Sequence, residues 1–126
     1  MRLLIPLGAA AVVAAALVVA GAPTAAQTAP PPAFAACRAC HTVELDGRNG
    51  IGPNLHGVVG RPAGTAPGFG YSPALKGSEL RWDESALDEY LASPSQKIPG
   101  TRMPISTPDP AKRAAIIAYL KAESAK

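Results

Sequence analysis

The sequence has almost no excess of charge of either sign. Its 126 residues carry 12 lysines and arginines against nine aspartates and glutamates, for a formal net charge of +3. Arg2 lies in an N-terminal apolar segment that is expected to be removed, which leaves 11 basic against nine acidic residues and a net charge of +2. Because nucleic-acid-binding domains carry a clustered basic surface, this balance argues against nucleic acid as a partner.

Strand-like runs, internal repeats and catalytic groupings are also missing. No segment alternates apolar and polar residues over a useful length, and no segment repeats another. The sequence offers neither an activated nucleophile nor an acid/base pair. These absences favour an all-α protein that is not an enzyme.

Only two cysteines are present, and both lie in Cys37-Arg38-Ala39-Cys40-His41. This spacing lets two sulfurs add to the two vinyl groups of one haem while the adjoining imidazole reaches the iron. A thioredoxin-like dithiol expects a βαβ context, a zinc site needs two more ligands, and a disulfide here would close a short, strained loop. The motif therefore predicts one haem c, covalently attached through Cys37 and Cys40, with His41 as an iron ligand.

The N-terminal segment predicts export. Arg2 precedes an uncharged stretch rich in alanine, valine and leucine, and small residues follow at Thr24-Ala25-Ala26. This pattern is typical of a secretory signal peptide, here residues 1–26. The alternative is an uncleaved membrane anchor formed by residues 3–22, which approach the roughly 20 residues needed to span a bilayer. Either way the haem domain is expected to be periplasmic, soluble or tethered.

One small domain is expected after this segment. Residues 27–32 would be a proline-rich linker or the mature N-terminus, and residues 33–126 the domain itself. A domain of about 100 residues buries a marginal apolar core, which a haem would complete. The density of Gly, Pro and Asn predicts loops over residues 47–70.

Short helices are predicted on both sides of that loop region. The first covers about residues 32–40, with prolines in its first turn. Capping residues precede three others: Ser72 before a helix that Gly77 ends, Asp83 before one that ends ahead of Pro94, and Asp109 before the last. A further turn over residues 95–97 completes an all-α domain.

Met103 is the leading candidate for the second axial ligand. It is the only methionine besides the initiator, and it lies in Ile98-Pro99-Gly100-Thr101-Arg102-Met103-Pro104. The prolines and glycine exclude a helix there, so a loop would present the thioether. The alternatives are His56, a lysine or an open position. The short tether between His56 and His41 hinders access of His56 to the opposite haem face.

Five separated motifs together resemble the class I c-type cytochromes of the mitochondrial cytochrome c and bacterial cytochrome c2 type. In the order of that family, they are Cys37-Arg38-Ala39-Cys40-His41-Thr42-Val43, Gly52-Pro53-Asn54-Leu55-His56-Gly57, Ala66-Pro67-Gly68-Phe69, Ile98-Pro99-Gly100-Thr101-Arg102-Met103 and Ile117-Ala118-Tyr119-Leu120-Lys121. The resemblance implies a small cytochrome c fold, in which short helices and long loops wrap one haem. It also implies a one-electron carrier with His/Met ligation through His41 and Met103.

The resemblance implies roles for six further residues. The Pro53 carbonyl would accept a hydrogen bond from His41 and orient it. The other five would lie around the haem. Arg61, Tyr71 and Trp82 would lie near a buried propionate, and the hydroxyls of Tyr90 and Thr101 would lie on the methionine side.

The chain also departs from the family. The N-terminal helix is short, and Ala36, Ser95 and Gln96 replace lysines that such proteins use to dock acidic partners. The predicted function is that of a monomeric carrier between redox proteins: a membrane reductase, an oxidase or an exported dehydrogenase. The alternatives are a haem subunit of a larger complex, and a haem sensor or peroxidase with a labile methionine.

Overall fold

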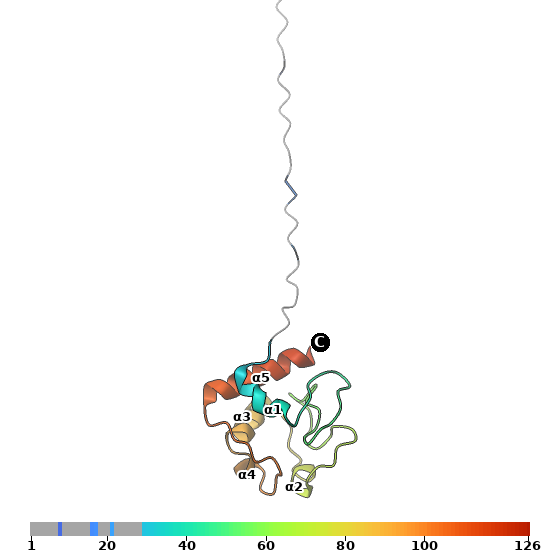
Figure 1. Ribbon diagram of the computed structural model, residues 1–126, viewed down its shortest axis with the longest axis vertical. Coiled ribbons are helices and arrows are strands. Elements are labelled where there is room, and N and C mark those ends of the chain that lie inside the picture. The colour runs from blue at the N-terminus through green and yellow to red at the C-terminus, as the bar shows by residue number, and fades with distance from the viewer. Residues whose placement is uncertain (1–7, 9–15, 18–20, 22–28) are drawn as a thin grey trace, which may run out of the picture.

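The computed structural model describes residues 8, 16, 17, 21 and 29–126. Along these ranges the chain forms only short helices joined by long loops (Figure 1): η1 (Pro32–Phe34), α1 (Ala35–Arg38), α2 (Pro73–Lys76), α3 (Glu84–Ala92), α4 (Pro94–Lys97) and α5 (Pro110–Ser124). The described residues contain no strand, only an isolated bridge between Pro62 and Arg81. The all-α prediction is confirmed.

The predicted signal peptide or anchor over residues 1–26 lies largely outside the described residues. Within the described ranges, no helix has both the length and the apolar character needed to cross a membrane. Of the predicted linker, residues 29–31 lead directly into η1.

The three predicted capping residues all begin helices. Ser72 Oγ accepts a hydrogen bond from a backbone N–H of α2 at 3.2 Å. In the same way Asp83 Oδ1 accepts from α3 at 2.7 Å, and Asp109 Oδ1 accepts from α5 at 2.9 Å. Each bond satisfies an N–H that would have no partner inside the helix. Pro73 and Pro110 occupy the first turns of α2 and α5, where no backbone N–H is required.

The first helix is shorter than the sequence suggests. A 3-10 turn leads into α1, which ends at Arg38 rather than near Cys40. The backbone N–H groups of Cys40 and His41 both donate to the Cys37 carbonyl, at 3.1 and 2.9 Å. This shared acceptor tightens the chain into a turn and ends the helix, so that His41 lies outside it.

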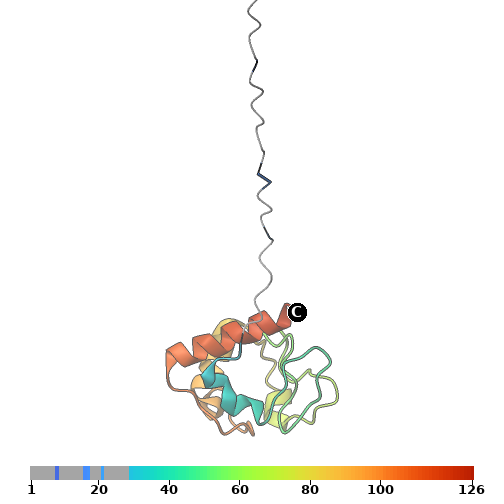
Figure 2. The same cartoon turned by 45° about the horizontal axis from the view of Figure 1, so that its top comes forward.

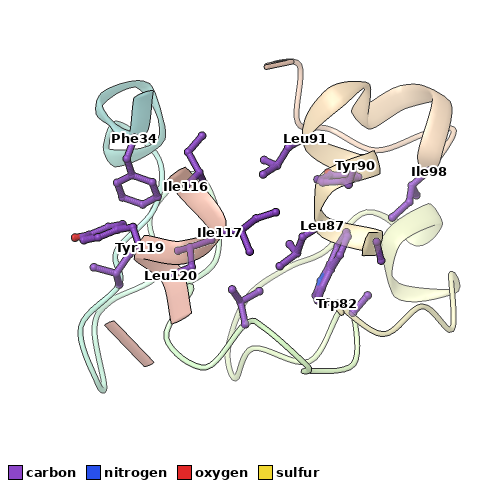
Figure 3. Packing of buried hydrophobic residues seen from close by; sticks show 14 residues of the cluster. Phe34, Trp82, Leu87, Tyr90, Leu91, Ile98, Ile116, Ile117, Tyr119 and Leu120 are labelled. Carbon is purple, nitrogen blue, oxygen red and sulfur yellow. The ribbon is translucent and has the colours of Figure 1, made fainter. Parts of the chain in front are cut away.

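The core lies where η1, α3 and α5 meet. α5 packs against both η1 and α3 (Figure 2). Phe34, only 1% exposed, places its ring 4.8 Å from that of Tyr119, edge to face, beside Ile116 of α5 (Figure 3). On the α3 side, Trp82 and Tyr90 lie 4.9 Å apart between ring centres. This scaffold supports the long loops that carry the candidate site.

Candidate haem-binding site

The two cysteines lie at the end of α1, in and just beyond its last turn. Both are free thiols and half-buried, and Cys37 packs against the edge of the core. Burial raises the pKa of the Cys37 thiol, and the neighbouring Cys40 adds to the effect. Two reduced, half-buried thiols three residues apart suit attachment to one porphyrin edge.

The imidazole of His41 is fixed by one strong hydrogen bond. Its Nδ1 lies 2.7 Å from the Pro53 carbonyl oxygen, which can only accept, so Nδ1 carries the proton and donates. Burial lowers the pKa of His41, which keeps the ring neutral near pH 7. The lone pair of Nε2 is therefore available to a metal, as a haem ligand requires.

Gly52 provides the surface against which this ring packs. A Cβ built on Gly52 would overlap the His41 imidazole, whose atoms are its three nearest neighbours. The Gly52 N–H donates to the Cys40 carbonyl at 2.8 Å, and the Gly50 N–H donates to the Gly52 carbonyl at 2.9 Å. The backbone next to His41 is thus held in place from both directions, and only glycine fits there.

A network of asparagine side chains supports the loop that carries Pro53. Asn54 Nδ2 donates to Thr42 Oγ1 at 2.8 Å and to the Glu44 carbonyl at 3.0 Å. Asn49 accepts from the Asn54 N–H at 2.8 Å and donates to the Pro67 carbonyl at 2.9 Å. Neither Asn49 nor Asn54 was predicted to support the site. Only their position in a loop rich in glycine and proline indicated such a role, since asparagine commonly bonds to backbone in such turns.

Arg61 carries an unsatisfied buried donor. Its Nη1 donates to the His56 carbonyl at 3.1 Å and its Nη2 to the Asn54 carbonyl at 3.2 Å. Its Nε is buried and has no hydrogen-bond partner among the described residues. Burial lowers the pKa of Arg61. A buried guanidinium N–H without a partner fits an anionic group, such as a haem propionate.

The other two residues predicted near a propionate lie close to Arg61. The backbone N–H of Trp82 donates to the Arg61 carbonyl at 2.9 Å, and the Trp82 side chain is buried. The Tyr71 hydroxyl accepts a hydrogen bond from the Ala66 N–H at 2.9 Å, and Tyr71 lies near enough to Arg61 to contribute to the pKa of the guanidinium. The structure thus brings together three residues from three loop segments.

Tyr90 and Thr101 also meet as the resemblance implies. Their hydroxyl oxygens lie 2.6 Å apart, which joins α3 to the loop that carries Met103. Burial raises the pKa of Tyr90, so the phenol stays protonated. Met103 is half-buried and packs against the core, whereas the neighbouring Arg102 and Pro104 are exposed. The loop therefore turns its one sulfur inward.

His56 has a different environment. Its Nδ1 lies 3.0 Å from the Val43 carbonyl, which is the hydrogen bond expected of a structural histidine. No group of three or more His, Cys, Asp or Glu side chains in the described ranges could hold a metal ion. The zinc alternative for the cysteine motif thus lacks its further ligands among these residues.

Comparison with known proteins identifies the family. The family described as cytochrome c matches residues 32–124. The chain belongs to the cytochrome c family. It is 53% identical over 92 residues to cytochrome c2 iso-2 of Magnetospirillum fulvum, an alignment that covers 72% of this chain and 95% of that protein. It is 46% identical over 97 residues to cytochrome c2 of Rhodoblastus acidophilus, covering 74% and 91%.

A solved structure agrees with these relatives. Cytochrome cH from Methylobacterium extorquens superposes with a TM-score of 0.66 at 52% sequence identity, covering 71% of this chain and 90% of that one. The small all-α cytochrome c fold predicted from the sequence is therefore confirmed.

Membership of the cytochrome c family determines the cofactor and the class of activity. The chain carries one covalent haem c with its iron, since Cys37 and Cys40 have the spacing of the Cys-x-x-Cys-His motif. It is an electron-transfer protein rather than an enzyme, and as a carrier it exchanges electrons with redox partners. The free thiols, the fixed imidazole and the unpaired Arg61 Nε all fit this group.

Proposed function

We propose that this cytochrome c is an exported one-electron carrier whose haem iron is held by His41 and Met103. The hydrogen bond between His41 Nδ1 and the Pro53 carbonyl carries the proposal, because it leaves Nε2 unprotonated and fixes the ring. The inward thioether of Met103, on a loop bonded to Tyr90 through Thr101, supports the second position.

Each of these residues contributes to electron transfer without undergoing a chemical change. When bound, the haem supplies an iron that accepts and releases one electron. A neutral thioether from Met103 favours the ferrous state relative to a second imidazole and raises the reduction potential. Arg61 would hold a propionate, and the apolar side chains around Trp82 and Tyr90 exclude water. A site that keeps both ligands and little water reorganises little on electron transfer.

Replacing Met103 with alanine tests the ligation. The ferrous wild-type protein should bind carbon monoxide poorly, whereas Met103→Ala should bind it readily and show a changed ferric spectrum. His56→Gln is the matched control, and it should leave the spectrum unchanged. An unaltered spectrum in Met103→Ala would remove Met103 from the ligands. Ready carbon monoxide binding by the wild type would favour a sensor or peroxidase with a labile methionine.

The proposed partners are a membrane reductase on one side and an oxidase or exported dehydrogenase on the other, with the protein acting as a monomer. Ala36, Ser95 and Gln96 are exposed and uncharged where the mitochondrial type places docking lysines. We therefore expect the association rate with a partner to depend only weakly on ionic strength.

Export is tested on the expressed full-length chain. If residues 1–26 are a signal peptide, the purified protein should have the mass of a chain that begins after Ala26. It should also be recovered as a soluble periplasmic protein. Retention of the leader and recovery in the membrane fraction would instead indicate an anchor over residues 3–22.

A further inference from the structure

The loop that carries Met103 has few attachments of its own. It joins α4 to α5 (Figure 1), and three of its residues, Pro99, Pro104 and Pro108, lack an amide hydrogen. Residues 102–106 make no backbone hydrogen bond to any other described residue. The side chain of Arg102 makes one exposed contact, with Nη1 donating to the Gly70 carbonyl at 3.3 Å. Otherwise Met103 lies between one attachment that precedes it and one that follows it.

The preceding attachment is at Thr101, through the hydrogen bond to Tyr90. The following one begins at Thr107, whose N–H donates to the Leu91 carbonyl at 2.7 Å. Met103 lies two residues from the first and four from the second. Movement at Thr107 would therefore be transmitted to the Met103 thioether through residues 104–106, whose backbone makes no hydrogen bond to another described residue.

Arg113 of α5 reinforces this second attachment. Its Nη1 donates to the Thr107 carbonyl at 3.0 Å and to the Pro108 carbonyl at 2.7 Å. Its Nε donates to Asp88 Oδ1 of α3 at 2.7 Å. The Arg113 side chain is only 13% exposed, and its bonds to the Thr107 carbonyl and to Asp88 are partly buried, which limits competition from water.

We propose that Arg113 is a positioning residue for Met103, because its guanidinium fixes the C-terminal end of the loop to α3 and α5. The inference rests on the proposed ligation of iron by Met103. Without the guanidinium, the carbonyls of Thr107 and Pro108 would be paired only with water, which they reach by moving outward. Pro108 is already exposed, so the loop can open while the helices remain packed.

A second ion pair between the same helices provides the matched control. Lys121 Nζ of α5 lies 2.8 Å from Glu84 Oε1 of α3, but both side chains are more than half exposed and neither bonds to the loop. Exposed pairs of this kind contribute little. Lys121→Gln therefore removes a charge and an α3–α5 contact without touching the support of Met103.

The test is imidazole binding to the ferric holoprotein, because added imidazole competes with the thioether for iron. In Arg113→Gln the binding constant should rise by about tenfold or more, the scale expected for losing hydrogen bonds from a charged group. Arg113→Lys should recover part of the change, and Lys121→Gln should match the wild type. Chemical denaturation of each variant reports the stability of the whole domain separately.

An unchanged imidazole constant in Arg113→Gln, with a lowered unfolding midpoint, would overturn the inference, because it would show a structural role alone. Should Arg113→Gln fail to fold, Asp88→Asn decides. It keeps the guanidinium but weakens its Nε contact, and the imidazole constant should rise by a smaller factor; no rise would again overturn the inference.

Met103→Ala separates this inference from the proposed ligation. If Met103→Ala binds imidazole no better than the wild type, Met103 is not the ligand and the proposed ligation fails. If Met103→Ala binds imidazole far better while Arg113→Gln does not, only the role of Arg113 fails.

Discussion

At the scale of single residues, His41 is constrained by groups that surround its ring. The Pro53 carbonyl holds Nδ1, and the backbone of Gly52 lies against the ring face. Asn54 and Asn49 then hold the segment that carries Pro53. The orientation of the proposed ligand therefore depends on a loop whose own hydrogen bonds are made by side chains.

Gly52→Ala should disturb this arrangement. The new methyl group would overlap the His41 imidazole, and overpacking of this kind costs about 1–3 kcal/mol. We expect a lower denaturation midpoint of the holoprotein and an altered ferric spectrum. Gly70→Ala is the control, because a Cβ there meets nothing within 4 Å. Equal effects of the two substitutions would show that the space beside His41 is not limiting.

Arg61→Gln should lower the reduction potential. With Arg61 at a haem propionate, as proposed, removing its buried positive charge disfavours the added electron. Its Nε is a buried donor that has no hydrogen-bond partner among the described residues. Spectroelectrochemical titration measures the shift. Arg81→Gln also removes one positive charge, but Arg81 is exposed and screened by solvent. The reduction potential of this variant should therefore change less. Similar shifts in both variants would contradict a propionate contact at Arg61.

At the scale of elements, three helices begin where local chemistry predicts. The side chains of Ser72, Asp83 and Asp109 cap their helices by accepting a hydrogen bond from an N–H two or three residues ahead. Such a local contact can be predicted from residue type and spacing alone. The end of α1 was less predictable. It depends on the Cys37 carbonyl accepting two N–H groups, a turn that no residue type in Cys37-Arg38-Ala39-Cys40-His41 demands.

Asp83→Ala should destabilise α3, the helix that presents Tyr90 and Asp88. Loss of the cap costs about 1 kcal/mol, and the melting temperature of the holoprotein should fall accordingly. Asp83→Asn retains an oxygen acceptor and should lose much less. A decrease of the same size in both variants would assign the effect to charge rather than to the cap.

At the scale of the whole molecule, the helices are too short to be stable alone. Among the described helices, α1, α2 and α4 have four residues each, α3 has nine and α5 has 15. Isolated helices below roughly 12–15 residues are marginal in water. The contacts of α5 with η1 and α3 supply part of what is missing, and the haem supplies more apolar surface.

Removing the haem should therefore unfold much of the domain. We expect the double variant Cys37→Ala, Cys40→Ala, produced without haem, to lose most of the helical far-ultraviolet circular dichroism of the holoprotein. It should also lose its cooperative melting transition. An apoprotein that keeps the helical signal and melts cooperatively would show that the core of Phe34, Ile116 and Tyr119 is sufficient.

The sequence by itself determined the haem attachment, the all-α fold and three helix starts. Cys37, Cys40 and His41 are neighbours along the chain, and a cap and its N–H are two or three residues apart, so residue type and spacing express them directly. Only the tertiary structure decided the supports of the site. Asn49 reaches Pro67 across 18 residues and Arg113 reaches Asp88 across 25, and such contacts exist only once the loops have closed.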